Sequence, residues 1–130
     1  MMPNKKDLRL EKYNISTNRY RELKYFCMQY REKQSKLRSI TEISSPPIGE
    51  SVGKKTVDRT SDIAIQRMQL ESDMKMIEQA AENADKELSP YIISNVVDGI
   101  PYEYLGAPVG RRQFYQSRRK FFYILSTKKG

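Results

Sequence analysis

The stretch PVGRRQFYQSRRKFFYILS, residues 108–126, carries the pattern that decides the fold. Phe114, Phe121 and Leu125 follow one another at spacings of seven and four, so an α-helix places them along one narrow side. Arginine, lysine, glutamine and tyrosine side chains fill the opposite side. The pattern therefore predicts a helix from about residue 111 to residue 126, with one apolar face and one cationic face.

Two short helices are predicted directly before this one. Ser89 and Pro90 favour a helix start, with Ser89 as the N-cap, and Gly99 suits a left-handed turn that ends the helix. Residues 101–105 predict one or two further turns. Three short helices with tight connections are typical of a helix-turn-helix that binds DNA. We therefore predict a tri-helical helix-turn-helix unit over residues 89–130.

The first part of the chain predicts two longer helices. Apolar residues recur at helical spacing from Tyr20 to Leu37, with Asn18 as the expected N-cap. A second helix is expected from about Thr60 or Ser61, because a heptad-like seam follows, formed by Ile63, Leu70, Met74, Ile77, Ala81, Ala84 and Leu88. This seam favours packing against the first helix, and the alternative is a homodimer or oligomer through residues 63–88.

The predicted fold class is all-α, because no period-two alternation is long enough for a strand. Two long helices form a helical hairpin, and the tri-helical helix-turn-helix unit follows them. Between the long helices, two adjacent prolines and two glycines predict a flexible linker. The predicted segments are 1–40, the N-terminal basic tail and amphipathic helix; 41–57, the flexible linker; 58–88, the long heptad-like helix; and 89–130, the DNA-binding unit.

Charge is distributed unevenly along the chain, whose formal net charge is +8. Residues 1–40 hold eleven basic and four acidic residues, and residues 41–107 hold six basic and twelve acidic ones. Residues 108–130 hold seven basic residues and no acidic residue. A basic segment without a compensating carboxylate favours a polyanion, and nucleic acid is the usual one. Double-stranded DNA is therefore the predicted partner.

The cationic face of the last helix supplies the predicted DNA contacts. Arginine matches guanine edges or phosphate, and glutamine pairs with adenine. Because recognition helices address base edges with their N-terminal part, Arg112, Gln116 and Tyr115 are predicted to read bases. Arg118, Arg119 and Lys120, with Lys128 and Lys129 beyond them, are predicted to hold phosphate. The predicted DNA-binding set is Arg111, Arg112, Gln113, Tyr115, Gln116, Arg118, Arg119, Lys120 and Tyr123.

Catalysis, a cofactor and a metal site are not expected. The chain has no histidine and one cysteine, Cys27, which lies on the apolar side of its predicted helix. Gly53-Lys54-Lys55 departs from the phosphate-loop signature, because Lys55 stands where Ser or Thr is required. Residues 1–11 contain no apolar run of a secretory signal, and no stretch of about 18 apolar residues predicts a membrane span. A soluble cytoplasmic protein is expected.

Three parts of the last third resemble a known family. DGIPYEYL at residues 98–105, PVGRRQFY at 108–115 and RRKFFYIL at 118–125 resemble the C-terminal end of phage-encoded RinA/ArpU-type transcriptional regulators. Those proteins are similar to region 4 of sigma factors. YRELKYFCMQY at residues 20–30 is similar to the N-terminal helix of small prophage proteins of this kind. The resemblance implies a phage or prophage regulator of transcription in a bacterial cytoplasm, with RNA polymerase as a partner.

Two other classes of protein remain open. A phage small terminase subunit binds DNA through a helix-turn-helix for packaging and assembles as a ring, and the seam of residues 63–88 suits that alternative equally well. A ring of many subunits in solution would favour it, and a monomer or dimer would favour the regulator. A helical adaptor without a nucleic-acid partner predicts no salt-dependent DNA binding.

Overall fold

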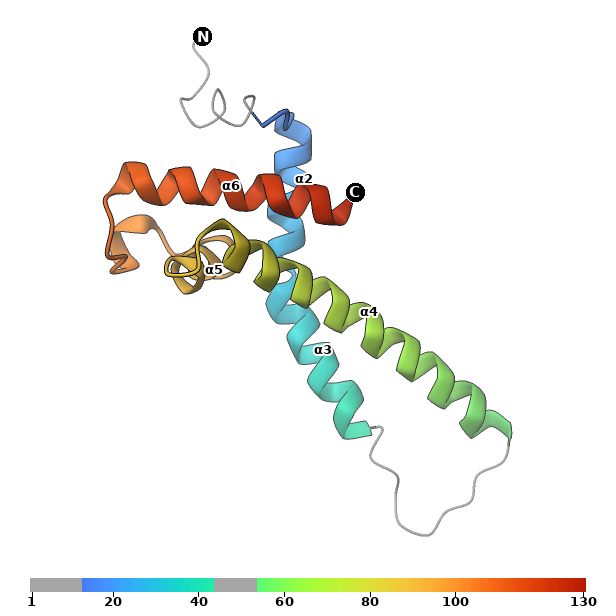
Figure 1. Ribbon diagram of the computed structural model, residues 1–130. Coiled ribbons are helices and arrows are strands. Elements are labelled where there is room, and N and C mark those ends of the chain that lie inside the picture. Colours follow the sequence, from blue (N-terminus) through green and yellow to red (C-terminus); the bar gives the residue numbers. More distant parts are fainter. Residues whose placement is uncertain (1–12, 44–53) are drawn as a thin grey trace. The chain divides into compact units, whose positions relative to one another are not determined.

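A computed structural model of the chain describes residues 13–43 and 54–130, and the side chains of residues 13–41 and 61–130. Within these ranges the protein is all-α, as predicted, and contains no strand. The elements are α2 (Thr17–Met28), α3 (Tyr30–Ile43), α4 (Lys54–Ala84), α5 (Ser89–Asp98), the 3-10 turn η1 (Tyr102–Tyr104) and α6 (Arg111–Lys129) (Figure 1).

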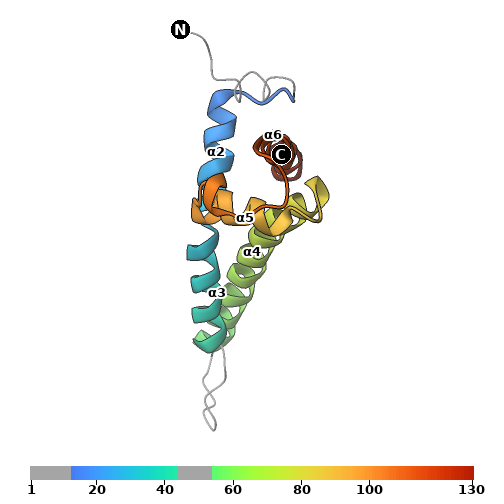
Figure 2. The same cartoon turned by 90° about the vertical axis from the view of Figure 1, so that its left-hand side faces the viewer.

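The chain forms two compact units, whose bounds cut across the predicted segments. Unit 1 comprises Met1–Gln29 and Met76–Gly130, and unit 2 comprises Tyr30–Lys75. In unit 1, helices α2, α5 and α6 pack on one another, and two views of the ribbon show α6 running past α2 and α5 (Figures 1 and 2). The predicted DNA-binding helix, α6, therefore packs against α5 and α2. Helix α2 comes from the other end of the sequence.

The N-cap of the first helix lies two residues before the predicted one. Ser16 is the N-cap of α2, and its hydroxyl accepts a hydrogen bond from the backbone N–H of Arg19 at 3.1 Å. The prediction of Asn18 as the cap is wrong, because Asn18 already lies inside the helix. The expected single helix from Tyr20 to Leu37 is interrupted at Gln29, which ends α2 before α3 begins.

Replacing Ser16 by alanine is expected to lower the free energy of unfolding by about 1 kcal/mol, because the Arg19 amide loses its acceptor. Asn18→Ala is the matched control and is expected to leave stability unchanged or slightly higher, since alanine is the better helix former. Urea unfolding followed by circular dichroism measures both variants. If Asn18→Ala lowered the free energy of unfolding more than Ser16→Ala does, Asn18 would be the cap, as the sequence predicts.

The second long helix also begins earlier than predicted. α3 ends at Ile43 and α4 starts at Lys54, so residues 41–43 and 54–57 of the predicted linker are helical, and residues 44–53 lie outside the described part of the chain. The heptad-like seam is buried from Ile77 onwards, where it joins the core of unit 1. Its earlier members, including Leu70 and Met74, are half-buried. The seam therefore packs into the core over its second half.

The corner between α4 and α5 is held by Asp85. One carboxylate oxygen, Oδ1, accepts hydrogen bonds from the backbone N–H groups of Glu87 and Leu88 at 3.1 and 3.2 Å. The predicted cap at Ser89 is wrong: α5 has Leu88 at its N-cap position, without a side-chain cap. At the other end, Gly99 closes α5 with φ 70° and ψ 21°, the left-handed conformation predicted for it.

The connection from α5 to α6 contains no α-helix, so the prediction of three helices over residues 89–130 is wrong in its middle element. That element, η1, is one 3-10 turn. Tyr102 fixes this connection, because its hydroxyl donates to the carbonyl of Val109 at 2.6 Å and its ring lies 5.5 Å from that of Phe114. Asn95 Nδ2 also donates to the carbonyl of Ile100 at 2.9 Å. The segment before α6 is thus tied to both neighbouring helices.

Unit 2 contains α3 and the part of α4 up to Lys75. Lys33 Nζ on α3 lies 3.0 Å from Asp73 Oδ2 on α4, and this ion pair links the two helices. No helix within residues 13–43 and 54–130 combines the length and the apolar character that a membrane crossing requires.

Candidate nucleic-acid interface

The buried side of α6 is aromatic and wider than the spacing pattern indicates. Phe114, Phe121 and Leu125 are fully buried, as predicted, and so is Phe122. The ring of Phe122 meets that of Phe121 edge-on at 5.1 Å and that of Tyr20, on α2, edge-on at 5.0 Å. Phe122 widens the buried arc because it lies roughly 100° further round the helix than Phe121. The packing of α2 therefore determines how much of α6 is covered.

Arg119 lies on the buried side, so its predicted place on the exposed face is wrong. Only 5% of its surface is exposed. The physical reason is the additional width of the buried arc, which extends past Phe122 towards Arg119. A side chain buried to this extent presents very little surface to a phosphate, so Arg119 is not among the candidate contacts.

Arg118 is engaged inside unit 1, although the sequence pattern assigns it to phosphate. Its Nε donates to Asn95 Oδ1 on α5 at 2.6 Å, and its Nη2 donates to the Tyr20 hydroxyl on α2 at 3.1 Å. The guanidinium also lies 4.9 Å from the centre of the Phe122 ring. Both hydrogen bonds are part-buried. Arg118 thus joins α6 to α2 and α5, and we leave it out of the candidate interface.

The remaining predicted contacts do lie at the surface of α6. Arg111, Arg112, Gln113, Gln116, Lys120 and Tyr123 are exposed, and Tyr115 is half-buried. Arg111 forms an exposed ion pair with Glu103 at 2.8 Å, and its guanidinium lies 5.7 Å from the centre of the Tyr115 ring. Such an exposed pair contributes little to stability, so a phosphate can replace the carboxylate. The exposed side of α6 therefore presents cations and amides together.

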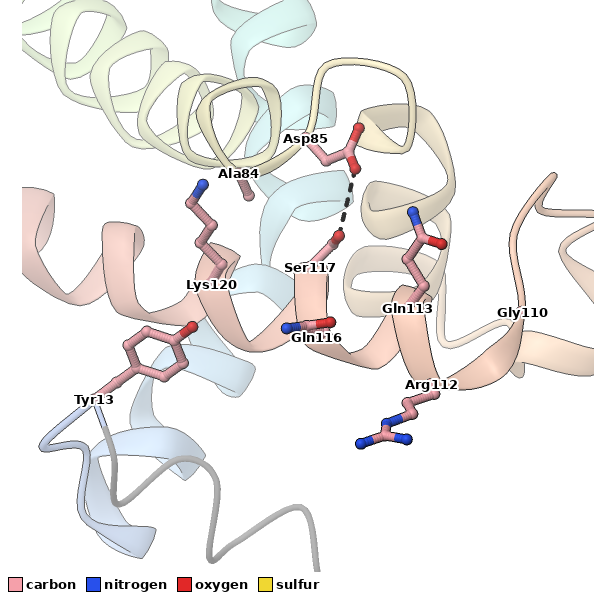
Figure 3. Close-up of a pocket in the computed structure, with 9 residues that line it drawn as sticks. All are labelled: Tyr13, Ala84, Asp85, Gly110, Arg112, Gln113, Gln116, Ser117 and Lys120. Atoms are coloured by element: carbon pink, nitrogen blue, oxygen red, sulfur yellow. Dashed lines mark hydrogen bonds between the residues drawn. The ribbon is translucent and has the colours of Figure 1, made fainter.

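This exposed side forms the floor of an open groove of about 640 Å³. Arg112, Gln113, Gln116, Ser117 and Lys120 of α6 line it, together with Tyr13, Ala84, Asp85 and Gly110 (Figure 3). In Figure 3, α6 passes between Tyr13 and the corner that carries Asp85. The groove brings together three parts of the chain that are far apart in the sequence.

Two residues that the sequence pattern does not indicate form the walls. Asp85 Oδ2 accepts a hydrogen bond from Ser117 Oγ at 3.4 Å, which fixes the α4–α5 corner against α6. Tyr13 lies with its ring centre 5.2 Å from that of Tyr123, at a tilt of 37°. Neither residue belongs to the periodic pattern of a predicted helix, so periodicity contains no signal that would place them here.

The last turn of α6 is held in part by α2. Arg19 donates from Nε to Ser126 Oγ and from Nη2 to the Ser126 carbonyl, both at 3.0 Å. Lys129 Nζ lies 5.1 Å from the centre of the Phe26 ring and 3.7 Å from Glu22 Oε1. Lys128 is exposed. Of the two terminal lysines, Lys128 is the one that stays in the candidate interface.

Within the part of the chain that the structure describes, no group of three or more Asp, Glu or Cys side chains is arranged as a metal site. Comparison of the chain with protein-family models, with curated proteins and with solved structures finds no match.

Proposed function

We propose that the protein binds double-stranded DNA through the N-terminal part of α6 and regulates transcription, without catalysis. The observation that carries the proposal is the division of α6 into a buried aromatic side and an exposed side whose first turn carries Arg112 and Gln113. Arginine and glutamine are the side chains that pair with guanine and adenine edges in the major groove. They lie in the first two turns of the helix, from which recognition helices contact bases.

Charge supports the same proposal. Residues 108–130 contain no acidic residue, and Arg111, Arg112, Lys120 and Lys128 are exposed cations in this segment. At the start of α6, the partial positive charge of the helix N-terminus adds to the attraction of Arg111 and Arg112 for phosphate. The transcriptional role rests on the resemblance of residues 98–105, 108–115 and 118–125 to phage RinA/ArpU-type regulators. In that role, RNA polymerase is the proposed protein partner.

Selection from a random duplex pool, followed by salt titration, tests this function. With about four cations on phosphate, the log–log slope of affinity against salt should be near −3 to −4, so affinity falls about 100-fold between 50 and 200 mM salt. Arg112→Ala is expected to relax the preference at one base pair by roughly 1–3 kcal/mol.

The matched control is Arg38→Ala, which removes the same charge from an exposed position of α3 in unit 2. It is expected to leave the sequence preference intact. A flat salt response in the unmodified protein, or equal effects of the two substitutions on the preference, would contradict the proposed base-reading role.

A further inference from the structure

Tyr13 and the Ala84–Asp85 corner rise on either side of the exposed side of α6, and they limit the width of a ligand that can contact it. A helix that enters the major groove fills it, because the groove is about 12 Å wide and a helix with its side chains is about 10–12 Å across. Tyr13 and the Ala84–Asp85 corner flank α6 where Gln116 and Lys120 form the floor (Figure 3). A paired duplex therefore has access to the start of α6, but the walled part suits a narrower ligand.

An aromatic pair stands beside the walled part. Tyr123 lies on the polar side of α6 and is 44% exposed, and the centre of its ring is 5.2 Å from that of Tyr13. Tyr13 itself lines the groove. Aromatic rings next to a cationic groove are the elements that bind single-stranded nucleic acid, because every base has a face that can stack.

The polar groups on the floor fit the same ligand. Lys120 offers a cation for a backbone phosphate, and Gln116 offers an amide donor and acceptor. The Watson–Crick edge of a base is available to such amides only where the base is unpaired.

From the walls, the tyrosine pair and the floor together, we infer that the groove binds an unpaired DNA strand, with a base stacked on the Tyr13–Tyr123 pair and its phosphate at Lys120. The inference rests on the proposed function and extends it. Arg112 and Gln113, at the start of α6, contact paired DNA at one end of the groove, and the part of the groove at Gln116 and Lys120 holds a strand that has separated.

Fluorescence anisotropy with the full chain tests the inference. The probes are a labelled oligothymidylate of about twelve nucleotides and a fully paired duplex of the same length, at one salt concentration. Tyr123→Leu is expected to weaken binding of oligothymidylate by about 5- to 100-fold more than it weakens duplex binding. Tyr123→Phe keeps the ring and should retain the affinity of the unmodified protein. Tyr104→Leu, at an exposed tyrosine outside the groove, is the matched control and should change neither affinity.

The outcomes separate the two proposals. Duplex binding together with equal oligothymidylate affinity in the Tyr123→Leu and Tyr104→Leu variants would overturn the inference and leave the proposed function standing. Equal weakening of both probes by Tyr123→Leu would also overturn it, because the ring would then contact a feature that both ligands share. Binding of oligothymidylate through Tyr123 without any duplex binding would contradict the proposed function alone.

Discussion

Replacing Phe121 by alanine is expected to lower the free energy of unfolding by about 3–5 kcal/mol, the cost of a large cavity in a core. Phe121 is fully buried, and its ring meets the edge of Phe122 at 5.1 Å. It lies on the side of α6 that is packed in unit 1 with α2 and α5. Because the total stability of a small domain is about 5–15 kcal/mol, a loss of this size is a large fraction of the whole. Urea unfolding followed by circular dichroism measures it.

The control for this prediction is Tyr104→Ala, which also removes an aromatic ring from unit 1. Tyr104 is 81% exposed on η1, so the substitution should change stability by less than about 0.5 kcal/mol. If Phe121→Ala were as stable as Tyr104→Ala, the buried side of α6 would have to lie elsewhere on the helix.

The sequence predicts the existence of the two faces of α6 but not their widths. Spacings of seven and four identify Phe114, Phe121 and Leu125, because a helix alone brings these residues to one side. Phe122 is covered by the helix that carries Tyr20, whose ring meets it edge-on. That helix, α2, is separated from α6 by most of the sequence, and periodicity within one segment contains no information about it.

Local signals were reliable where the backbone itself imposes the requirement. Gly99 was predicted to end α5 because its left-handed conformation favours glycine, and it does so. α4 starts earlier than apolar periodicity predicts, because Lys54 and Lys55 are good helix formers but add no residue to an apolar stripe. Apolar periodicity does not identify Ser16 either, since a cap is defined by a hydrogen bond and several nearby polar residues are able to supply it.

The candidate site was predicted in part for the same reason. The exposed residues of α6, such as Arg112 and Gln116, follow from the wheel of one helix. The walls of the groove do not, because Tyr13 and Asp85 reach α6 only through tertiary packing. Asp85 is, in addition, an acidic residue beside a basic helix, so a pattern of clustered positive charge does not indicate it.

Replacing Arg118 by alanine is expected to lower the free energy of unfolding by about 2–4 kcal/mol, from two charge-assisted hydrogen bonds and one cation–π contact. The donors reach Asn95 on α5 and the Tyr20 hydroxyl on α2, which is 98 positions away in the sequence. Arg118→Lys is expected to recover little of this, because a single ammonium cannot reproduce two donors in the fixed plane of a guanidinium that lies 4.9 Å from the Phe122 ring.

Arg112→Ala is the matched comparison, because it is expected to change DNA binding and not stability. Arg112 is exposed, so its loss should leave urea unfolding unchanged while it alters DNA recognition. Arg118→Ala should reduce stability, and at temperatures where the variant remains folded it should keep the salt dependence of DNA binding, since its guanidinium is bound to Asn95 and Tyr20. A stable Arg118→Ala variant whose salt slope falls by about one would instead show that Arg118 neutralises a phosphate, as the sequence pattern alone predicts. The two arginines, six positions apart on one helix, would then contact the same ligand.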